Sequence, residues 1–276
     1  MQSYKAPLFG NLPPVIKNLL IINILVFVLD FLLKKSGIDL TALLALHNVA
    51  SPYFKPFQFV TYMFMHGGLT HIFFNMFALV MFGKILEQVW GAKRFLIYYF
   101  VTGIGAAVLH SFVNYLNLQS LSTEITAFIN TPSPDVLLHI VRENLGQPSA
   151  WVNDFLSSYS MNPNNQQYIN EAVKLVNQIY TIHLNIPTVG ASGAVFGVLL
   201  AFGMLFPNTQ LMLLIPPIPI KAKYFVIIYG AIEFFGAVMQ QQGDNIAHFA
   251  HLGGMLFGYI LIKYWNSKGI GNFNRF

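Results

Sequence analysis

The sequence contains no cysteine, which excludes disulfide bonds, thiolate metal sites and cysteine nucleophiles. It also has few charges: only 9% of its 276 residues are Asp, Glu, Lys or Arg, while 55% are hydrophobic. A water-soluble domain carries about 25% charged residues, so this chain is too poor in charge to cover a globular surface in water. The composition therefore predicts an integral membrane protein whose surface is solvated by lipid.

Six apolar segments have the length of a membrane span, about 20 residues. In lipid the backbone must satisfy its own hydrogen bonds, and the alternating strand pattern of a closed barrel does not occur, so each segment is predicted to be a helix. The first is interpreted as a span and not as a removed signal peptide, because no small-residue cleavage site follows it. The predicted spans are residues 15–33, 62–83, 95–116, 189–206, 224–241 and 246–265.

The basic residues are too scattered to form a nucleic-acid surface. They leave a net charge of +5, but they occur in ones and twos without interleaved aromatic residues. Lys and Arg gather instead in the cytoplasmic loops of membrane proteins, so both termini are expected in the cytoplasm. Ten basic residues then lie inside (Lys5, Lys17, Lys84, Lys93, Arg94, Lys221, Lys223, Lys263, Lys268 and Arg275) and five outside (Lys34, Lys35, Lys55, Arg142 and Lys174).

A long polar stretch, residues 117–188, separates the third and fourth predicted spans. The Ser-Pro-Asp sequence at 133–135 is typical of a helix start, and apolar residues recur at helical spacing after Val136 and after Ile169. We expect two or three short amphipathic helices outside the membrane, either as a packing cap on the bundle or as a lid that selects substrates. The whole chain, 1–276, is expected to form one membrane domain with this insertion.

The start of the fourth predicted span carries a candidate nucleophile, Ser192, between Gly190 and Gly193. Small residues let a neighbouring helix come close, and the free amides at a helix N-terminus favour a developing negative charge. An acyl-transfer oxyanion needs such an environment. On this stretch alone Ser192 could equally be a packing residue, and the G-x-S-x-G elbow of soluble hydrolases is absent because Ala194 replaces its second glycine.

The sixth predicted span carries a candidate base, His251, followed by Gly254 and Gly258 at helical spacing. The glycines predict a tight helix–helix contact. If this contact faces Ser192, a neutral imidazole could take the serine proton. His248 lies one turn earlier, so a pair of packing or metal-binding histidines is the alternative.

Polar residues in two further spans also require an explanation, because they are expensive in lipid. His71 and Asn75 share one helix face and can donate hydrogen bonds to an oxyanion, with an interhelical hydrogen bond as the alternative. Glu233, in the middle of the fifth span, must be protonated or partnered. We expect a structural hydrogen bond to a polar group such as Gln240 or His248.

Together these motifs resemble the rhomboid family of intramembrane serine proteases, over all six predicted spans and in the same order. A fourth family motif, at the cytoplasmic end of the second span, is a structural element. The matching residues are His71 and Asn75 (H-x-x-x-N), Gly190, Ser192 and Gly193 (G-x-S-G), His251, Gly254 and Gly258 (the sixth-span histidine motif), and Gly83, Glu87 and Gly91 (G-x-x-x-E-x-x-x-G).

The resemblance implies an all-α, six-helix membrane bundle that cleaves transmembrane proteins inside the lipid bilayer. Ser192 would be the nucleophile and His251 the general base, as a dyad without the orienting carboxylate of the Ser-His-Asp triad. His71, Asn75 and the Ser192 backbone N–H would form the oxyanion hole, and Gly190 would give the scissile peptide access. We expect no cofactor and no metal, and a bacterial inner membrane as the location.

The sequence departs from the family pattern at three places. Phe196 stands where many members have a tyrosine that stacks on the catalytic histidine, and Phe57-Gln58 stands in place of the Trp-Arg pair of the first external loop. The stretch 117–188 also exceeds the usual connection.

Two other functions are compatible with parts of the pattern. A catalytically inactive rhomboid-like protein would bind membrane clients without cutting them, although such relatives typically lack the serine or the histidine. A metal transporter or intramembrane metalloprotease would use His66, His71, His248 and His251 as ligands. This second alternative fits less well because no H-E-x-x-H motif occurs.

Overall fold

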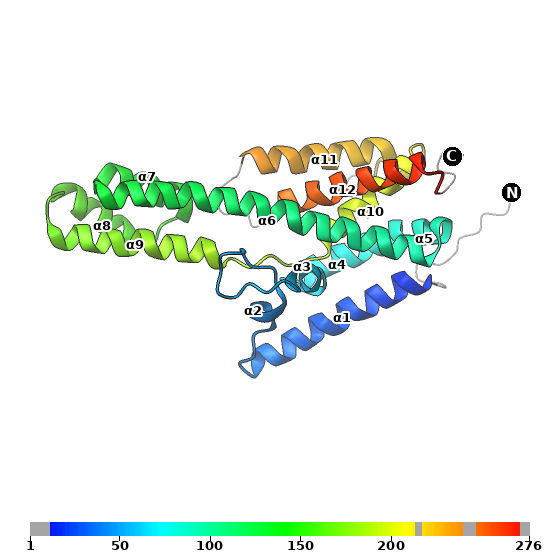
Figure 1. Cartoon of the computed structure of the whole chain (residues 1–276), viewed down its shortest axis with the longest axis horizontal. Helices are drawn as coiled ribbons and strands as arrows, with labels where there is room; N and C mark the ends of the chain where they lie inside the picture. Colours follow the sequence, from blue (N-terminus) through cyan, green and yellow to red (C-terminus); the bar gives the residue numbers. More distant parts are fainter. Residues whose placement is uncertain (1–11, 213–216, 240–246, 271–276) are drawn as a thin grey trace.

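The computed structural model describes residues 12–212, 217–239 and 247–270, and its regular structure is almost entirely helical (Figure 1). The exception among these residues is a short antiparallel ribbon of β1 (Gln210–Met212) and β2 (Pro219–Lys221), in which Leu211 pairs with Ile220. The helices are α1 (Pro14–Lys35), α2 (Leu40–Leu44), α3 (Gln58–Thr61), the 3-10 turn η1 (Tyr62–Phe64), α4 (Leu69–Ala78), the π-helical turn η2 (Leu79–Gly83), α5 (Lys84–Trp90), α6 (Ala92–Asn130), α7 (Pro134–Leu145), α8 (Ala150–Met161), α9 (Gln166–Asn185), α10 (Ser192–Leu205), α11 (Ala222–Met239) and α12 (His248–Ser267).

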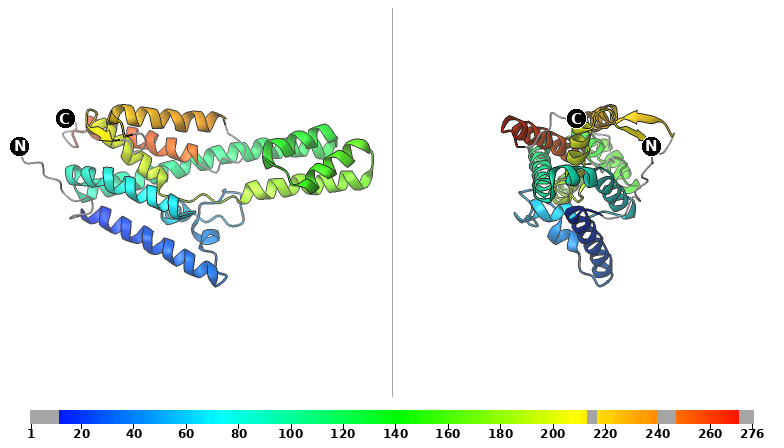
Figure 2. Two further views of the ribbon diagram at one scale, coloured as in Figure 1. Left: turned by 180° about the vertical axis from the view of Figure 1, so that it is seen from behind. Right: turned by 90° about the vertical axis from the view of Figure 1, so that its right-hand side faces the viewer.

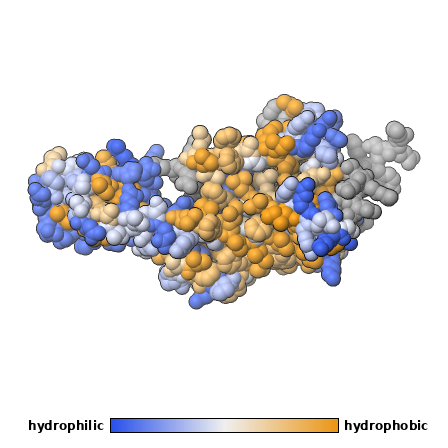
Figure 3. All heavy atoms as spheres, turned by 45° about the horizontal axis from the view of Figure 1, so that its top comes forward, coloured by the Kyte–Doolittle hydropathy of each residue, from blue (hydrophilic) through white to orange (hydrophobic). Residues whose placement is uncertain are grey.

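The chain is an integral membrane protein with an all-α fold. Four of the described helices are long and apolar enough to cross a bilayer, namely α1, the continuous helix Leu69–Trp90 (α4, η2 and α5), α6 and α11, and α10 is a shorter apolar helix. Large apolar side chains of α1 and α11 lie on the outside, among them Leu25 and Ile227, which are 62% and 65% exposed. Figure 3 shows this apolar surface as a broad band across the middle of the molecule, with hydrophilic surface at both ends. Lipid is the solvent that such a surface requires.

Two predicted spans differ from the observed helices. The second helix begins at Leu69 and ends at Trp90, not at 62 and 83, because η1 and an extended Gly68 precede it. The third helix does not end at 116 but continues as α6 to Asn130. Leu121, Ile125 and Phe128 keep an apolar stripe at helical spacing beyond that point, and the stripe is buried. The polar residues between them lie on the other faces, so they do not end the helix.

Helices α6, α10 and α12 pack tightly against one another, and α10 is buried over most of its length. Small residues make this possible. A Cβ atom at Gly254 of α12 would overlap the backbone carbonyl of Gly193 in α10, so the two helix backbones are in direct contact. Gly258 lies one turn further along α12, against the hydroxyl of Tyr98 in α6.

The G-x-x-x-E-x-x-x-G element holds the N-terminus of α1. The Glu87 carboxylate accepts hydrogen bonds from the backbone N–H groups of Val15 (2.9 Å) and Ile16 (2.8 Å), which have no partner within their own helix. Gly83 faces the Ile16 side chain, and Gly91 forms the turn between α5 and α6. The motif therefore ties α1, α5 and α6 together.

Residues 118–185 form what we call the outer lobe, where α7, α8 and α9 pack around the far end of α6 (Figures 1 and 2). Ser149 and Asn165 accept backbone N–H groups at the starts of α8 and α9, as N-cap residues do. The core of the lobe consists of large side chains, including Phe128, Leu137, Phe155 and Tyr159. The face of the lobe that is visible in Figure 3 is mostly hydrophilic. The expected short helices are present, and the lobe also includes about the last three and a half turns of α6.

Candidate active site

Ser192 and His251 lie within hydrogen-bonding distance of each other, although they are far apart in the sequence. Nε2 of His251 is 2.8 Å from Oγ of Ser192. Ser192 is the first residue of α10, and His251 lies in the first turn of α12, where its side chain is buried. The contact between Gly193 and Gly254, described above, holds the two helices at the separation that this pair needs.

The backbone just before α10 turns sharply to present Ser192. Gly190 has a φ of +127°, which is accessible to glycine but strained for other residues, and its N–H donates to the carbonyl of Tyr62 at 2.9 Å. A Cβ atom at Gly190 would lie 2.7 Å from Cε1 and Nε2 of His71. Glycine is therefore required here both by the backbone angle and by the space next to His71.

Phe196 covers one face of the His251 imidazole. The two rings are stacked with their centroids 4.2 Å apart and an angle of 10° between their planes. Phe196 lies one turn after Ser192 on α10, so the same helix supplies the hydroxyl and the stacking ring. The departure from tyrosine at this position keeps the stack and removes only the phenol hydroxyl.

His71 of α4 lies in the same region, and Asn75 is one turn further along the same face of that helix. His71 borders Gly190, and a Cβ atom added to Gly190 would lie 3.6 Å from Oγ of Ser192. Asn75 is 5% exposed, and its Nδ2 has no hydrogen-bond partner in the part of the chain that the structure describes. A buried amide donor without a partner is costly, unless a ligand accepts from it. The backbone N–H of Ser192 is a further donor at the start of α10, with no partner within its helix.

Glu233 places a carboxylate on the far side of His251. Its Oε2 lies 2.6 Å from Nδ1 of His248 and 2.8 Å from Nδ1 of His251. The first contact is a hydrogen bond, whereas the N–H of His251 is not yet aligned with the carboxylate. Of the two partners expected for Glu233, His248 is observed, and Gln240 lies outside the described residues. The contact with His251 was missed from the sequence, which suggested a dyad without a carboxylate.

The same three side chains form the one cluster among the described residues with the geometry to hold a metal ion. The ligand atoms of Glu233, His248 and His251 all lie within 4.8 Å of one another. The four-histidine set considered from the sequence is not this group: His66 instead packs edge-on against His71, with ring centroids 5.1 Å apart. A metal at the observed cluster would occupy Nδ1 of His251 and leave its Nε2 facing Ser192.

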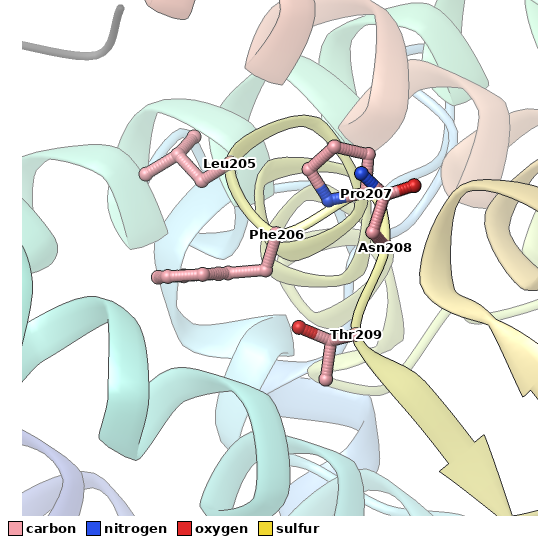
Figure 4. Close-up of a pocket in the computed structure, with 5 residues that line it drawn as sticks. All are labelled: Leu205, Phe206, Pro207, Asn208 and Thr209. Carbon is pink, nitrogen blue, oxygen red and sulfur yellow. The ribbon is translucent and has the colours of Figure 1, made fainter. Parts of the chain in front are cut away.

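A surface hollow of about 360 Å³ lies away from this site. It is lined by residues 205–209, where α10 ends and the chain leads into β1 (Figure 4). Ser192 is at the opposite end of α10, about 20 Å away along the helix axis. The hollow therefore takes no part in the chemistry of Ser192.

Comparison with known proteins agrees with this architecture. The family model described as the Rhomboid domain matches residues 53–129 and 154–267. Rhomboid protein 1, mitochondrial, of Saccharomyces cerevisiae is 34% identical over 84 residues, or 30% of this chain and 23% of that protein. Rhomboid-like protein 11, chloroplastic, of Arabidopsis thaliana is 30% identical over 110 residues, or 40% of this chain and 37% of that protein. The matched region thus spans less than half of each of these relatives.

Proposed function

Because the chain belongs to the rhomboid family, we propose that it is an intramembrane serine endopeptidase that hydrolyses peptide bonds of transmembrane proteins. The observation that carries this proposal is the 2.8 Å contact between Oγ of Ser192 and Nε2 of His251. A nucleophile and a base within hydrogen-bonding distance, together with nearby oxyanion donors, are the parts that acyl transfer requires. Both members of the pair are present, which argues against a relative that binds its clients without cutting them.

The proposed reaction proceeds through an acyl-enzyme. Oγ of Ser192 attacks the carbonyl carbon of the substrate while Nε2 of His251 takes the hydroxyl proton. When the tetrahedral intermediate collapses, the C–N bond breaks and His251 gives that proton to the leaving amine. A water molecule then attacks the ester, His251 accepts one of its protons, and the carboxylic acid leaves as Ser192 regains its hydrogen.

The negative charge of the tetrahedral intermediate needs donors that are already in place. We assign this role to His71, to Nδ2 of Asn75 and to the backbone N–H of Ser192. The unpartnered amide of Asn75 supports the assignment, because a donor fixed before the reaction stabilises the oxyanion without reorganising. Gly190, next to His71, leaves room for the scissile peptide, which must be unwound because a helical peptide bond is shielded from attack.

We further propose that the six helices α1, Leu69–Trp90, α6, α10, α11 and α12 each cross the membrane, and that the outer lobe lies outside it. An even number of crossings puts both termini on one side, and the distribution of Lys and Arg favours the cytoplasmic side. A bacterial inner membrane stays a prediction, since the two relatives named above are mitochondrial and chloroplastic proteins.

The proposal is tested with purified protein in detergent and a generic transmembrane substrate. Wild-type protein should cleave the substrate, and a fluorophosphonate should label it at Ser192, as located by mass spectrometry. Ser192→Ala and His251→Ala should each lower cleavage by about 10⁴-fold or more. The matched control is Ser157→Ala, which changes an exposed serine of α8 and should cleave like wild type. Full activity in the Ser192→Ala protein would contradict the proposal, and absence of both cleavage and labelling in wild type would favour an inactive client-binding protein.

A further inference from the structure

The buried carboxylate of Glu233 lies on the opposite side of His251 from Ser192. On α11 the neighbouring side chains Phe234 and Phe235 are 55% and 60% exposed on the apolar surface, whereas Glu233 is 7% exposed and points into the bundle. A carboxylate at this depth is expensive unless it is partnered. Its partners are the two imidazoles of α12, so this carboxylate links α11 to α12.

The atoms around His251 follow the order of a catalytic triad: carboxylate, imidazole, hydroxyl. Oε2 of Glu233 lies 2.8 Å from Nδ1, and Oγ of Ser192 lies 2.8 Å from Nε2. If Nδ1 carries the proton, Nε2 has its lone pair free to accept from the serine; in the other tautomer it has not. A carboxylate beside Nδ1 selects the first tautomer, and a slight turn of the ring or of the carboxylate brings the N–H into line, as catalytic hydrogen bonds tighten when substrate binds.

We propose that Glu233 is the positioning residue of the site, making it a Ser192–His251–Glu233 triad in place of a dyad; this inference rests on the proposed function. Glu233 fixes the tautomer and orientation of His251. It also stabilises the imidazolium that forms when His251 takes the serine proton, which would otherwise be a bare cation in surroundings of low dielectric constant. Glu233 itself transfers no proton and touches no substrate.

His248 holds this carboxylate in place from the other side. Its Nδ1 is 2.6 Å from the same Oε2. Its ring packs against Gly236 of α11, where a Cβ atom would lie 2.5 Å from Cε1. Glu233 and Gly236 are three residues apart on one face of α11, and His248 and His251 are three apart on one face of α12. These four residues form one part of the contact between the two helices, and they fix the position of the carboxylate.

The deciding variant is Glu233→Gln, which keeps the shape of the side chain and removes its charge. The Gln amide can donate to Nδ1 and so favour the unproductive tautomer of His251. We expect kcat to fall by about 10²-fold or more while KM changes by no more than about twofold. Glu233→Asp should recover part of the loss, because the charge is restored. His248→Gln should lower kcat by no more than about tenfold, since His251 keeps its own contact with the carboxylate.

Two further measurements separate positioning from a merely structural role. Nitrogen-15 NMR of the labelled histidines should report a protonated Nδ1 for His251 in wild type and a shift towards Nε2 protonation in Glu233→Gln. Thermal unfolding should show that this variant is folded. Glu124→Gln, a half-buried glutamate of α6 in the outer lobe, is the matched control and should leave kcat unchanged.

The outcomes distinguish this inference from the proposed function. If wild type does not cleave, the proposed function fails. If wild type cleaves and folded Glu233→Gln cleaves equally fast, the triad alone is wrong. Zinc analysis tests whether the cluster holds a metal instead. Stoichiometric zinc in the purified wild-type protein, lost in Glu233→Gln, would indicate a metal site. If a chelator also raised cleavage, the triad would be overturned in favour of that site.

Discussion

The membrane bundle and the outer lobe are both helical, yet they are packed in opposite ways. Helices α10 and α12 meet through glycines, so that backbone contacts backbone at Gly193 and Gly254. The outer lobe has a single glycine, Gly146, which lies at a helix end, and it fills its interior with large side chains such as Phe128 and Tyr159. The bundle depends on small residues that let helix backbones touch, whereas the lobe depends on large side chains that fill its core.

The surrounding solvent explains this difference. In lipid, apolar side chains gain little by turning inward, so helices associate by close packing of small residues and by polar contacts. At a hydrophilic surface, burial of apolar area drives assembly, and each helix shows an apolar stripe facing the core. The polar side chains follow the same division. Ser192 and Glu233 each contact His251 inside the bundle, whereas the polar side chains of the lobe mostly bond to their own helices.

The largest effect is expected from removing atoms in the lobe. Phe128→Ala leaves a cavity at a fully buried position and should destabilise the lobe by about 4 kcal/mol. Hydrogen–deuterium exchange of α7, α8 and α9 should speed up, while fluorophosphonate labelling of Ser192 persists. The neighbouring Ile129→Ala, at an exposed position, is the control. Loss of labelling together with faster exchange would mean that the two regions unfold as one.

Adding an atom in the bundle should have a slightly smaller effect. Gly254→Ala places a methyl group against the Gly193 carbonyl, which is part of the backbone and cannot rotate away. The variant should be destabilised by about 3 kcal/mol. We expect a lower Tm in detergent and loss of substrate cleavage. In the control, Gly230→Ala, the added methyl meets only the flexible end of Met255 and should be tolerated. Equal Tm values for the two variants would contradict the backbone contact.

Removing a single donor tests whether a buried polar group serves chemistry or packing. Asn75→Ala should lower kcat by about 10²-fold, or about 2.7 kcal/mol, because one oxyanion donor is lost. Asn177→Ala, in the lobe, removes an exposed amide that bonds only its own helix at the Val173 carbonyl and should leave kcat unchanged. Unchanged turnover in Asn75→Ala would reassign that residue to packing.

The smallest effect concerns a helix start in the lobe. Ser149→Ala removes the hydroxyl that accepts a hydrogen bond from the Val152 N–H at the start of α8. It should lower the stability of this helix by about 1 kcal/mol. The expected readout is faster hydrogen exchange confined to the first turn of α8, with cleavage unaffected. Ser157→Ala, within the same helix, should not change exchange in that turn.

The sequence was sufficient to predict the all-α membrane fold. It also singled out Ser192 and His251, which lie 2.8 Å apart, because chemistry-bearing side chains are rare in apolar spans. It was not sufficient for the ends of helices. The sequence did not reveal that α6 continues beyond residue 116. Polar residues on two faces of this part of the helix lower its mean hydropathy, even though Leu121, Ile125 and Phe128 keep the helical spacing. The contact of Glu233 with His251 depends on how α11 and α12 are rotated about their own axes, and no local pattern encodes that rotation.

The length of α6 determines how far the outer lobe can move relative to Ser192. A helix of 39 residues is about 58 Å long, nearly twice the hydrocarbon thickness of about 30 Å. From residue 106 to 130 it contains neither proline nor glycine, so it has no point at which helices commonly bend. In the membrane arrangement that we propose, the lobe therefore keeps a constant height above the bilayer, because it could move down only if α6 broke. The bulky extramembrane domains of the proposed substrates would then have to pass beside it.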